Sequence, residues 1–260
     1  MAKRRRIWLL AGMLVALVAL VCLALHDPEP SYKGKSLRVW ILKDTSPEFG
    51  YSKEAKEAVL QIGTNGVPIF LKMLRAKDSK LKSGFIKLLE KQSLVGLRLT
   101  PAGDKNLAAC RAFEILGADA RTAVPELVKI YEENISTGSQ CLTAASIGYI
   151  GPSASNAISA LLRGVKTTND PVRWNTVWAL GKIHGEPELV LPVLLKLIRD
   201  PNSFVARHSS QALGDYGTNA RPVVRDLIKM LNDPNEATRY FATNALKQID
   251  PEAAAKAGVN

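Results

Sequence analysis

DPVRWNTVWALGKI at residues 170–183 sets the pattern of the C-terminal half, because two later stretches repeat it: DPNSFVARHSSQALGDY at 200–216 and DPNEATRYFATNALKQI at 233–249. The Ala-Leu pairs at 179–180, 212–213 and 245–246 recur every 33 residues. A constant interval of this length is typical of a solenoid, in which each unit buries its apolar face only by stacking on its neighbours. Solenoids present long surfaces, so function is to be sought on a surface before a pocket.

A second signature alternates with the first. It reads GADARTAVPEL from Gly117, GPSASNAISAL from Gly151 and GTNARPVVRDL from Gly217, with a shortened earlier copy, GTNGVPIFLKML, from Gly63. Glycine favours the left-handed backbone that ends helices, so we expect helix ends or turns at Gly117, Gly151, Gly185 and Gly217. The Asp-Pro pairs at Asp170, Asp200 and Asp233 are expected to begin helices, with Asp accepting the first amide hydrogen bonds.

These two signatures resemble HEAT repeats, of the bacterial type similar to phycobilin-lyase HEAT-like repeats. The closest match is VRWNTVWALGKI at 172–183; the resemblance is strong over 105–250 and weak over 53–104. Two features depart from it: Ala206 stands where an Arg is usual, with Arg207 one place later, and LVGLRLTPAGDKN at 94–106 fits no repeat. The start, YKGKSLRVW, also resembles N-terminal segments of membrane-anchored HEAT proteins of unknown role.

The resemblance implies an all-α fold, a right-handed α-solenoid of stacked antiparallel helix pairs with one concave wall. It does not imply one activity, because HEAT arrays are mostly protein-binding scaffolds, some bind nucleic acid, and the phycobilin-lyase relatives act on chromophores. We divide the chain into an irregular N-terminal repeat region (53–104), a repeat array (105–250) and a tail (251–260).

The N-terminus indicates the compartment. A basic segment (1–6) containing KRRR precedes 7–25, which is uncharged and mostly apolar. At the helical rise per residue, the apolar segment spans roughly 28 Å, about one bilayer core. We expect a retained transmembrane anchor with the basic residues in the cytoplasm and the body in the periplasm. The alternative is a signal peptide and a secreted protein, although Cys22-Leu23-Ala24 is a poor cleavage site.

Residues 26–52 contain several prolines and glycines and are predicted to form a linker. One short element is expected within it, at Ser36–Lys43. We expect Leu37, Trp40 and Ile41 to dock this element on the first repeat; a ligand contact by Trp40 is the alternative.

Composition leaves the partner open. The formal net charge is +11, to which the basic N-terminus contributes 4, so the body is moderately basic. Nucleic-acid binding is compatible with this charge but not implied by it. There are three cysteines and no CxxC pair. Cys110 and Cys141 are expected as two free, semi-buried thiols, with a disulfide as the alternative.

Residues that could act in catalysis or bind a metal are scattered along this sequence. His26, His184 and His208 lie far apart in the repeat frame, and no phosphate loop or HExxH motif occurs. His184, Glu186 and Glu188 have two interpretations, a metal site and a structural turn, and we favour the turn. We therefore expect no catalytic residues, no metal, no cofactor and no enzymatic activity.

Equivalent positions of three successive repeats predict a binding strip. Positions 174, 207 and 240 are equivalent, as are 178, 211 and 244, and each pair shares one helical face. The strip comprises Trp174, Trp178, Arg207, Gln211, Tyr240 and Asn244. We expect it on the concave wall, where Trp, Tyr and Arg resemble an interface hot spot. The alternative is that both tryptophans only pack between helices.

A basic patch occupies the weaker N-terminal region. Its members are Lys72, Arg75, Lys77, Lys80, Lys82, Lys87 and Lys91. A solvated face is the plain interpretation, and contact with acidic lipid head groups is the alternative.

The sequence as a whole predicts a membrane-anchored extracytoplasmic scaffold that binds a protein or peptide through its concave face. A HEAT-type nucleic-acid binder is the first alternative and a chromophore or small-molecule lyase the second. Neither the partner nor the oligomeric state can be predicted from the sequence.

Overall fold

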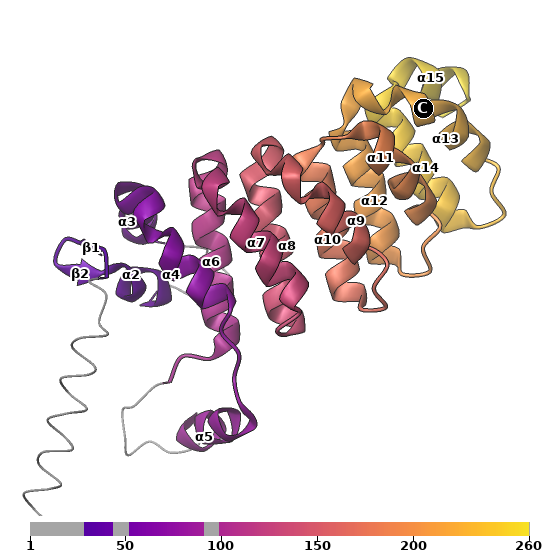
Figure 1. The fold of residues 1–260 in the computed structure, drawn as a ribbon. Coiled ribbons are helices and arrows are strands. Elements are labelled where there is room, and N and C mark those ends of the chain that lie inside the picture. Colours follow the sequence, from indigo (N-terminus) through magenta and orange to yellow (C-terminus); the bar gives the residue numbers. More distant parts are fainter. Residues whose placement is uncertain (1–28, 44–51, 91–98, 260) are drawn as a thin grey trace, which may run out of the picture.

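The computed structural model describes residues 29–43, 52–90 and 99–259, and within them nearly all regular structure is helical. Successive helices pack on one another in chain order and form an elongated stack (Figure 1). The predicted helical-repeat solenoid is therefore confirmed. Within these ranges, no helix is both long and apolar enough to cross a bilayer. The predicted anchor at 7–25 lies outside them.

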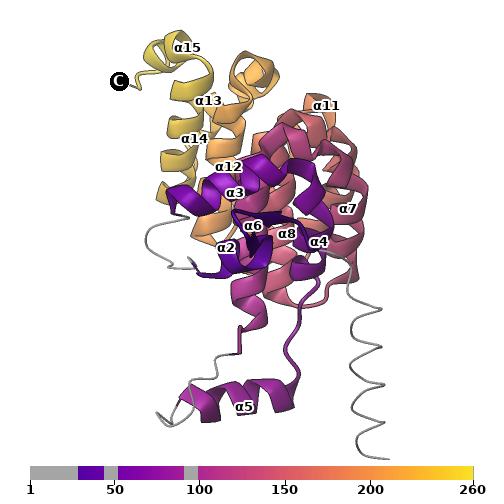
Figure 2. The same ribbon diagram turned by 90° about the vertical axis from the view of Figure 1, so that its left-hand side faces the viewer.

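The stack has two layers of α-helices. The first, here called the long-helix layer, contains α6 (Ala102–Leu116), α8 (Thr137–Ile150), α10 (Asp170–Ile183), α12 (Ser203–Asp215) and α14 (Glu236–Ile249). The second contains α4 (Val67–Leu74), α7 (Val124–Glu133), α9 (Ile158–Gly164), α11 (Pro187–Leu197) and α13 (Val224–Met230). Each long helix packs directly against the next one along the chain. Both layers are visible in Figure 1, and Figure 2 looks along the stack from its N-terminal end.

Short 3-10 helices connect the layers at four places: η1 (Gly63–Gly66), η2 (Gly117–Ala123), η3 (Gly151–Ala157) and η4 (Gly217–Val223). Each begins with a glycine at positive φ, between 51° and 70°. At Gly117 and Gly151 the ψ angles are −130° and −145°, a region that side chains with a Cβ rarely adopt. The glycine prediction holds at these turns.

Gly185 is the exception. The positive φ angles of the α10–α11 turn belong to its neighbours, His184 (34°) and Glu186 (47°). A Cβ added to Gly185 would lie 2.9 Å from Cδ1 of Ile158, so a larger residue there would displace the end of that side chain.

The helix caps correct a second prediction. The residues that accept the first amide hydrogen bonds of α10, α12 and α14 are Asn169, Asn202 and Asn235, not the aspartates of the Asp-Pro pairs. These asparagines occupy one position in successive repeats, and Ser136, which caps α8, extends the series by one repeat. Asp200 and Asp233 instead accept hydrogen bonds from the backbone N–H groups of the capping asparagines, at 2.9 and 3.0 Å.

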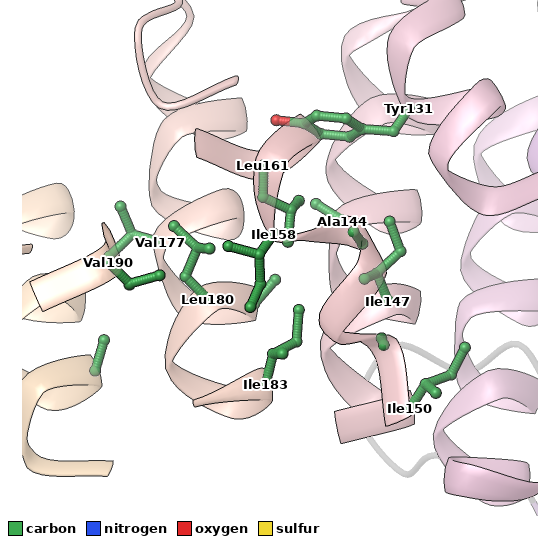
Figure 3. Close-up of a cluster of buried hydrophobic side chains, with 14 of the residues drawn as sticks. Tyr131, Ala144, Ile147, Ile150, Ile158, Leu161, Val177, Leu180, Ile183 and Val190 are labelled. Atoms are coloured by element: carbon green, nitrogen blue, oxygen red, sulfur yellow. The ribbon is translucent and has the colours of Figure 1, made fainter. Parts of the chain in front are cut away.

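The core is a continuous apolar band between the two layers (Figure 3). Leu180, Leu213 and Leu246 are fully buried, as the repeat frame predicted. Polar side chains in the core are paired: the Tyr131 hydroxyl lies 2.7 Å from Thr176 Oγ1, and Ser210 donates to the carbonyl of Phe241 at 2.7 Å. Such pairing is expected, because an unpaired buried polar group is costly.

The N-terminal end contains more structure than the predicted linker. A two-stranded antiparallel hairpin, β1 (Ser31–Tyr32) and β2 (Lys35–Ser36), precedes α2 (Leu37–Lys43). Leu37 and Ile41 are fully buried, and α2 contacts α3 (Lys53–Ile62) and α6, so the predicted docking occurs. Trp40 instead packs on the hairpin, where its Nε1–H donates to the carbonyl of Tyr32 at 2.9 Å.

Two further segments complete the described chain. Over 53–104, α3, η1 and α4 repeat the helix order of later units, whereas α5 (Lys80–Glu90) lies apart from the stack in both views (Figures 1 and 2). Within the predicted tail, α15 (Pro251–Lys256) packs on α14 and buries Ala254.

Candidate functional site

The six strip residues lie on three consecutive long helices, α10, α12 and α14, two from each. Arg207, Gln211 and Tyr240 are exposed, while Trp174, Trp178 and Asn244 are half-buried. Packing between neighbouring long helices holds these three helices at fixed spacing. The structure thus places the predicted strip on one layer of the stack, partly open to solvent.

Trp174 is fixed by a stacked neighbour in the next repeat. The ring of His208 lies 5.2 Å from it, centroid to centroid, with an interplanar angle of 18°. His208 is half-buried, and burial, together with the charge of Arg207, holds the pKa of its imidazole below the ordinary value. The neutral ring is therefore favoured in the folded protein.

Trp178 both packs between repeats and faces solvent. Its ring meets Tyr149 of α8 edge-on at 5.0 Å, and a Cβ added to Gly148 would lie only 2.6 Å from it. Lys182 is a further contact, with its Nζ 6.0 Å from the ring centroid. Both predicted roles for the tryptophans, packing and surface exposure, are thus partly present at this residue.

Beside Trp178 lies a pocket of about 320 Å³ between α10, α12 and α14. Its lining residues are Trp178, Lys182, His208, Gln211, Ala212, Asp215 and Gln248. Lys182 and Asp215, which occupy the same position in successive repeats, form an ion pair across it at 3.0 Å. Lys182 neutralises the charge of Asp215, which is the one carboxylate in the lining. The pocket therefore has polar walls, with the rings of Trp178 and His208 among its lining residues.

Sequence reasoning missed Phe204 and His208 as neighbours of the strip. Phe204 is 53% exposed, and the Arg207 guanidinium lies 5.1 Å from its ring centroid. The signal was available, because 204, 208 and 211 share one face of α12 at helical spacing. With Tyr240, which is 61% exposed, Phe204 gives this layer two large exposed aromatic rings on adjacent helices.

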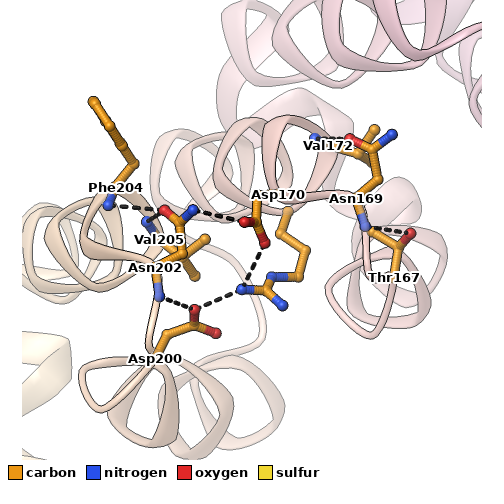
Figure 4. Close-up of polar contacts among 9 residues, drawn as sticks. Thr167, Asn169, Asp170, Val172, Asp200, Asn202, Phe204 and Val205 are labelled. Carbon is orange, nitrogen blue, oxygen red and sulfur yellow. Dashed lines mark hydrogen bonds and ion pairs between the residues drawn. The ribbon is translucent and has the colours of Figure 1, made fainter.

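Polar contacts join neighbouring repeats near Phe204 (Figure 4). Arg173 pairs with both Asp170 and Asp200, and Arg199 pairs with Asp233 at 2.8 Å. The Arg173–Asp200 and Arg199–Asp233 pairs join successive repeats beside the first turns of the long helices. They stabilise the spacing of the helices that carry the strip.

The residues of the basic patch differ in whether they form ion pairs. Arg75 pairs with Glu126 and Glu133 of α7, which raises the pKa of its guanidinium, and Lys82 pairs with Asp78. Lys72, Lys77 and Lys80 are exposed, and no ion pair involves them in the described part of the chain. Lys91 and the side chain of Lys87 lie outside the described residues.

The other candidate residues are the two cysteines and the residues near the α10–α11 turn. Both Cys110 and Cys141 are free thiols, as expected. Burial raises the pKa of Cys110 to about 12 and that of Cys141 to about 11. His184, Glu186 and Glu188 lie in and just after the α10–α11 turn, and no group of three or more possible metal ligands occurs among the described residues.

The chain is similar to known helical repeats. A family model described as HEAT repeats matches residues 124–214 and 191–257. Among solved structures, an engineered protein from the Northeast Structural Genomics Consortium is 20% identical, with a TM-score of 0.41, over 81% of this chain and 96% of that one. No curated protein matches the chain.

Proposed function

Because the chain belongs to the HEAT-repeat family, we propose that it is a scaffold that binds another protein or peptide through the strip on α10, α12 and α14. The observation that carries the proposal is the exposure of Phe204, Arg207 and Tyr240 on adjacent long helices. Side chains of these types dominate the binding energy of protein interfaces. Repeat proteins bind through such extended surfaces.

The half-buried residues support the proposal by their rigidity. Trp174 is stacked on His208, and Trp178 is wedged against Tyr149. Side chains that are already ordered lose little conformational entropy when a partner docks on them. A rigid aromatic base with exposed rings around it therefore suits binding better than the same residues on a loop.

We further propose that residues 7–25 anchor the chain in the cytoplasmic membrane with the repeats on the periplasmic side. The basic residues before this apolar segment favour that orientation. Secretion after cleavage is the alternative. A reporter that is active only outside the cytoplasm, fused after Asn260, should be active; activity of a cytoplasm-only reporter there would contradict the orientation.

The two other functions make different demands. Nucleic-acid binding calls for a continuous basic wall. A lyase calls for convergent acid–base groups. In the pocket beside the strip, Lys182 forms an ion pair with Asp215, which is the one carboxylate of the pocket lining. These contacts favour protein binding over both. That the chain is not an enzyme stays a prediction.

Site-specific photo-crosslinking in native membranes tests the proposed face. A crosslinking amino acid at Phe204, beside the strip, or at Tyr240, within it, should capture one discrete partner, because both side chains are exposed. The matched control is Leu189, which is 56% exposed on α11 of the other layer. Capture of the same partner from Leu189, but not from Phe204 or Tyr240, would assign binding to the opposite layer.

A further inference from the structure

Helix α5 carries an apolar stripe that the described part of the chain leaves open. Leu81, Phe85 and Leu88 follow the i, i+4, i+7 spacing of one helix face. They are 87%, 47% and 61% exposed. Isolated exposed apolar residues are normal, but three on adjoining turns of one helix form a continuous patch.

Outside the stripe, α5 contains Lys80, Lys82 and Lys87 together with Ile86, Leu89 and Glu90. Lys80 is exposed, and by helical spacing positions 80 and 87 lie on one flank of the stripe, with Lys82 on the other flank. No acidic residue occurs in the first turn of α5. An apolar stripe flanked by lysines is the pattern of a helix that lies in the plane of a membrane surface.

One edge of α5 is tied to the stack. Lys82 pairs with Asp78 and donates to the carbonyl of Thr100 at 3.3 Å. Asp78 in turn accepts a 2.7 Å hydrogen bond from the backbone N–H of Ala102, at the start of α6. These contacts attach α5 beside the base of α6 through Lys82 and leave the stripe outside the stack.

We infer that α5 lies in the head-group region of an anionic membrane, with Leu81, Phe85 and Leu88 toward the acyl chains. This inference rests on the proposed anchor at residues 7–25. The exposed Lys72, Lys77 and Lys80 supply the positive charge that anionic lipids attract. The partner is therefore a lipid surface rather than a protein.

The position of α5 agrees with a membrane at this end. The described chain begins just before the β1–β2 hairpin, which lies at the same end of the stack as α5 (Figure 1). Residues 26–30 can span at most about 18 Å between the end of the apolar segment and the hairpin. The first repeats, and not the strip on α10 to α14, would then face the bilayer.

A depth measurement on the full chain tests this inference. Leu88→Cys, in a Cys22→Ser background, would be labelled with an environment-sensitive fluorophore; Cys110 and Cys141 react slowly because their thiol pKa values are raised. The chain would be placed in nanodiscs containing phosphatidylglycerol, with spin-labelled acyl chains as quenchers. Leu189→Cys, on an exposed residue of α11, is the matched control.

We expect the probe at position 88 to be quenched several-fold more strongly than the probe at position 189. Quenching at position 88 should weaken in discs of phosphatidylcholine alone. Equal quenching at both positions, with the chain retained in the disc, would overturn the placement of α5 but not the anchor. Loss of the chain from the disc would overturn both. A signal at position 88 that depends on protein concentration and not on lipid charge would overturn the lipid placement and assign the stripe to a second copy of the chain.

Discussion

Asn202 caps α12 and at the same time binds the preceding repeat, because its Nδ2 donates a 2.8 Å hydrogen bond to Asp170 Oδ2 (Figure 4). The same relationship occurs one repeat earlier, where Asn169 Nδ2 donates to Thr137 Oγ1 at 3.0 Å. One side chain thus both satisfies the exposed amides of its own helix and fixes the distance to the preceding one. The helices that carry the strip are aligned by these bonds.

Removing this side chain should therefore cost more than an ordinary cap. Asn202→Ala is expected to lower the free energy of unfolding by about 1–3 kcal/mol, because it loses the cap and the inter-repeat hydrogen bond together. Urea unfolding measures the effect. Asn232→Ala is the control, on an exposed residue of the turn after α13. It should change stability by less than about 0.5 kcal/mol. Equal effects of the two substitutions would contradict this role for Asn202.

Close packing between long helices gives the second prediction. Gly148, Gly181 and Gly214 occupy one position in three successive repeats, and a Cβ at Gly181 would lie 2.7 Å from Cβ of Ala212. Gly181→Ala should destabilise the protein by about 1–3 kcal/mol, through overpacking. Gly138→Ala is the control, since it meets nothing within 4 Å and a helix favours Ala over Gly. A neutral or stabilising Gly181→Ala would show that the repeats are not in van der Waals contact there.

The buried leucines and the helix caps show what the sequence could and could not predict. The repeat period and the buried leucines could be read directly, because apolar spacing follows helix geometry. The Asp-Pro pairs, however, were more conspicuous than the asparagines that cap the helices. Asp and Asn both suit a helix start, so residue type alone could not decide between neighbours.

The site was predictable in part for a similar reason. Equivalent positions in the repeats identified Trp174, Arg207 and Tyr240, because a shared frame implies a shared face. His208 and Phe204 were missed because one repeat carries them alone. The hairpin before α2 was also missed, since two-residue strands show no alternation.

The lowered pKa of His208 predicts a pH dependence of stability. The unfolded chain binds this proton more tightly than the folded protein does, so stability is fully present above the ordinary pKa of 6.5 and is lost as pH falls below it toward the lowered folded value. Arg207 adds to the shift, Gln211 opposes it, and Trp174, Lys182 and Asp215 are the other nearby groups.

Thermal unfolding at neutral and at mildly acidic pH measures this effect. The midpoint of His208→Gln should fall less on acidification than that of the unsubstituted protein. If the two proteins lose stability in parallel, His208 is not the group responsible.

The Tyr240→Ala variant tests the binding strip most directly. Two quantities are measured on it: its affinity for the crosslinked partner and its free energy of unfolding. Tyr240 is exposed on the strip. We therefore predict that binding weakens by about 2 kcal/mol, as at interface anchors. Stability should change by less than about 0.5 kcal/mol, as for other surface substitutions. Leu189→Ala should leave both unchanged. Unaltered affinity in Tyr240→Ala, with weakened affinity in Leu189→Ala, would contradict the account.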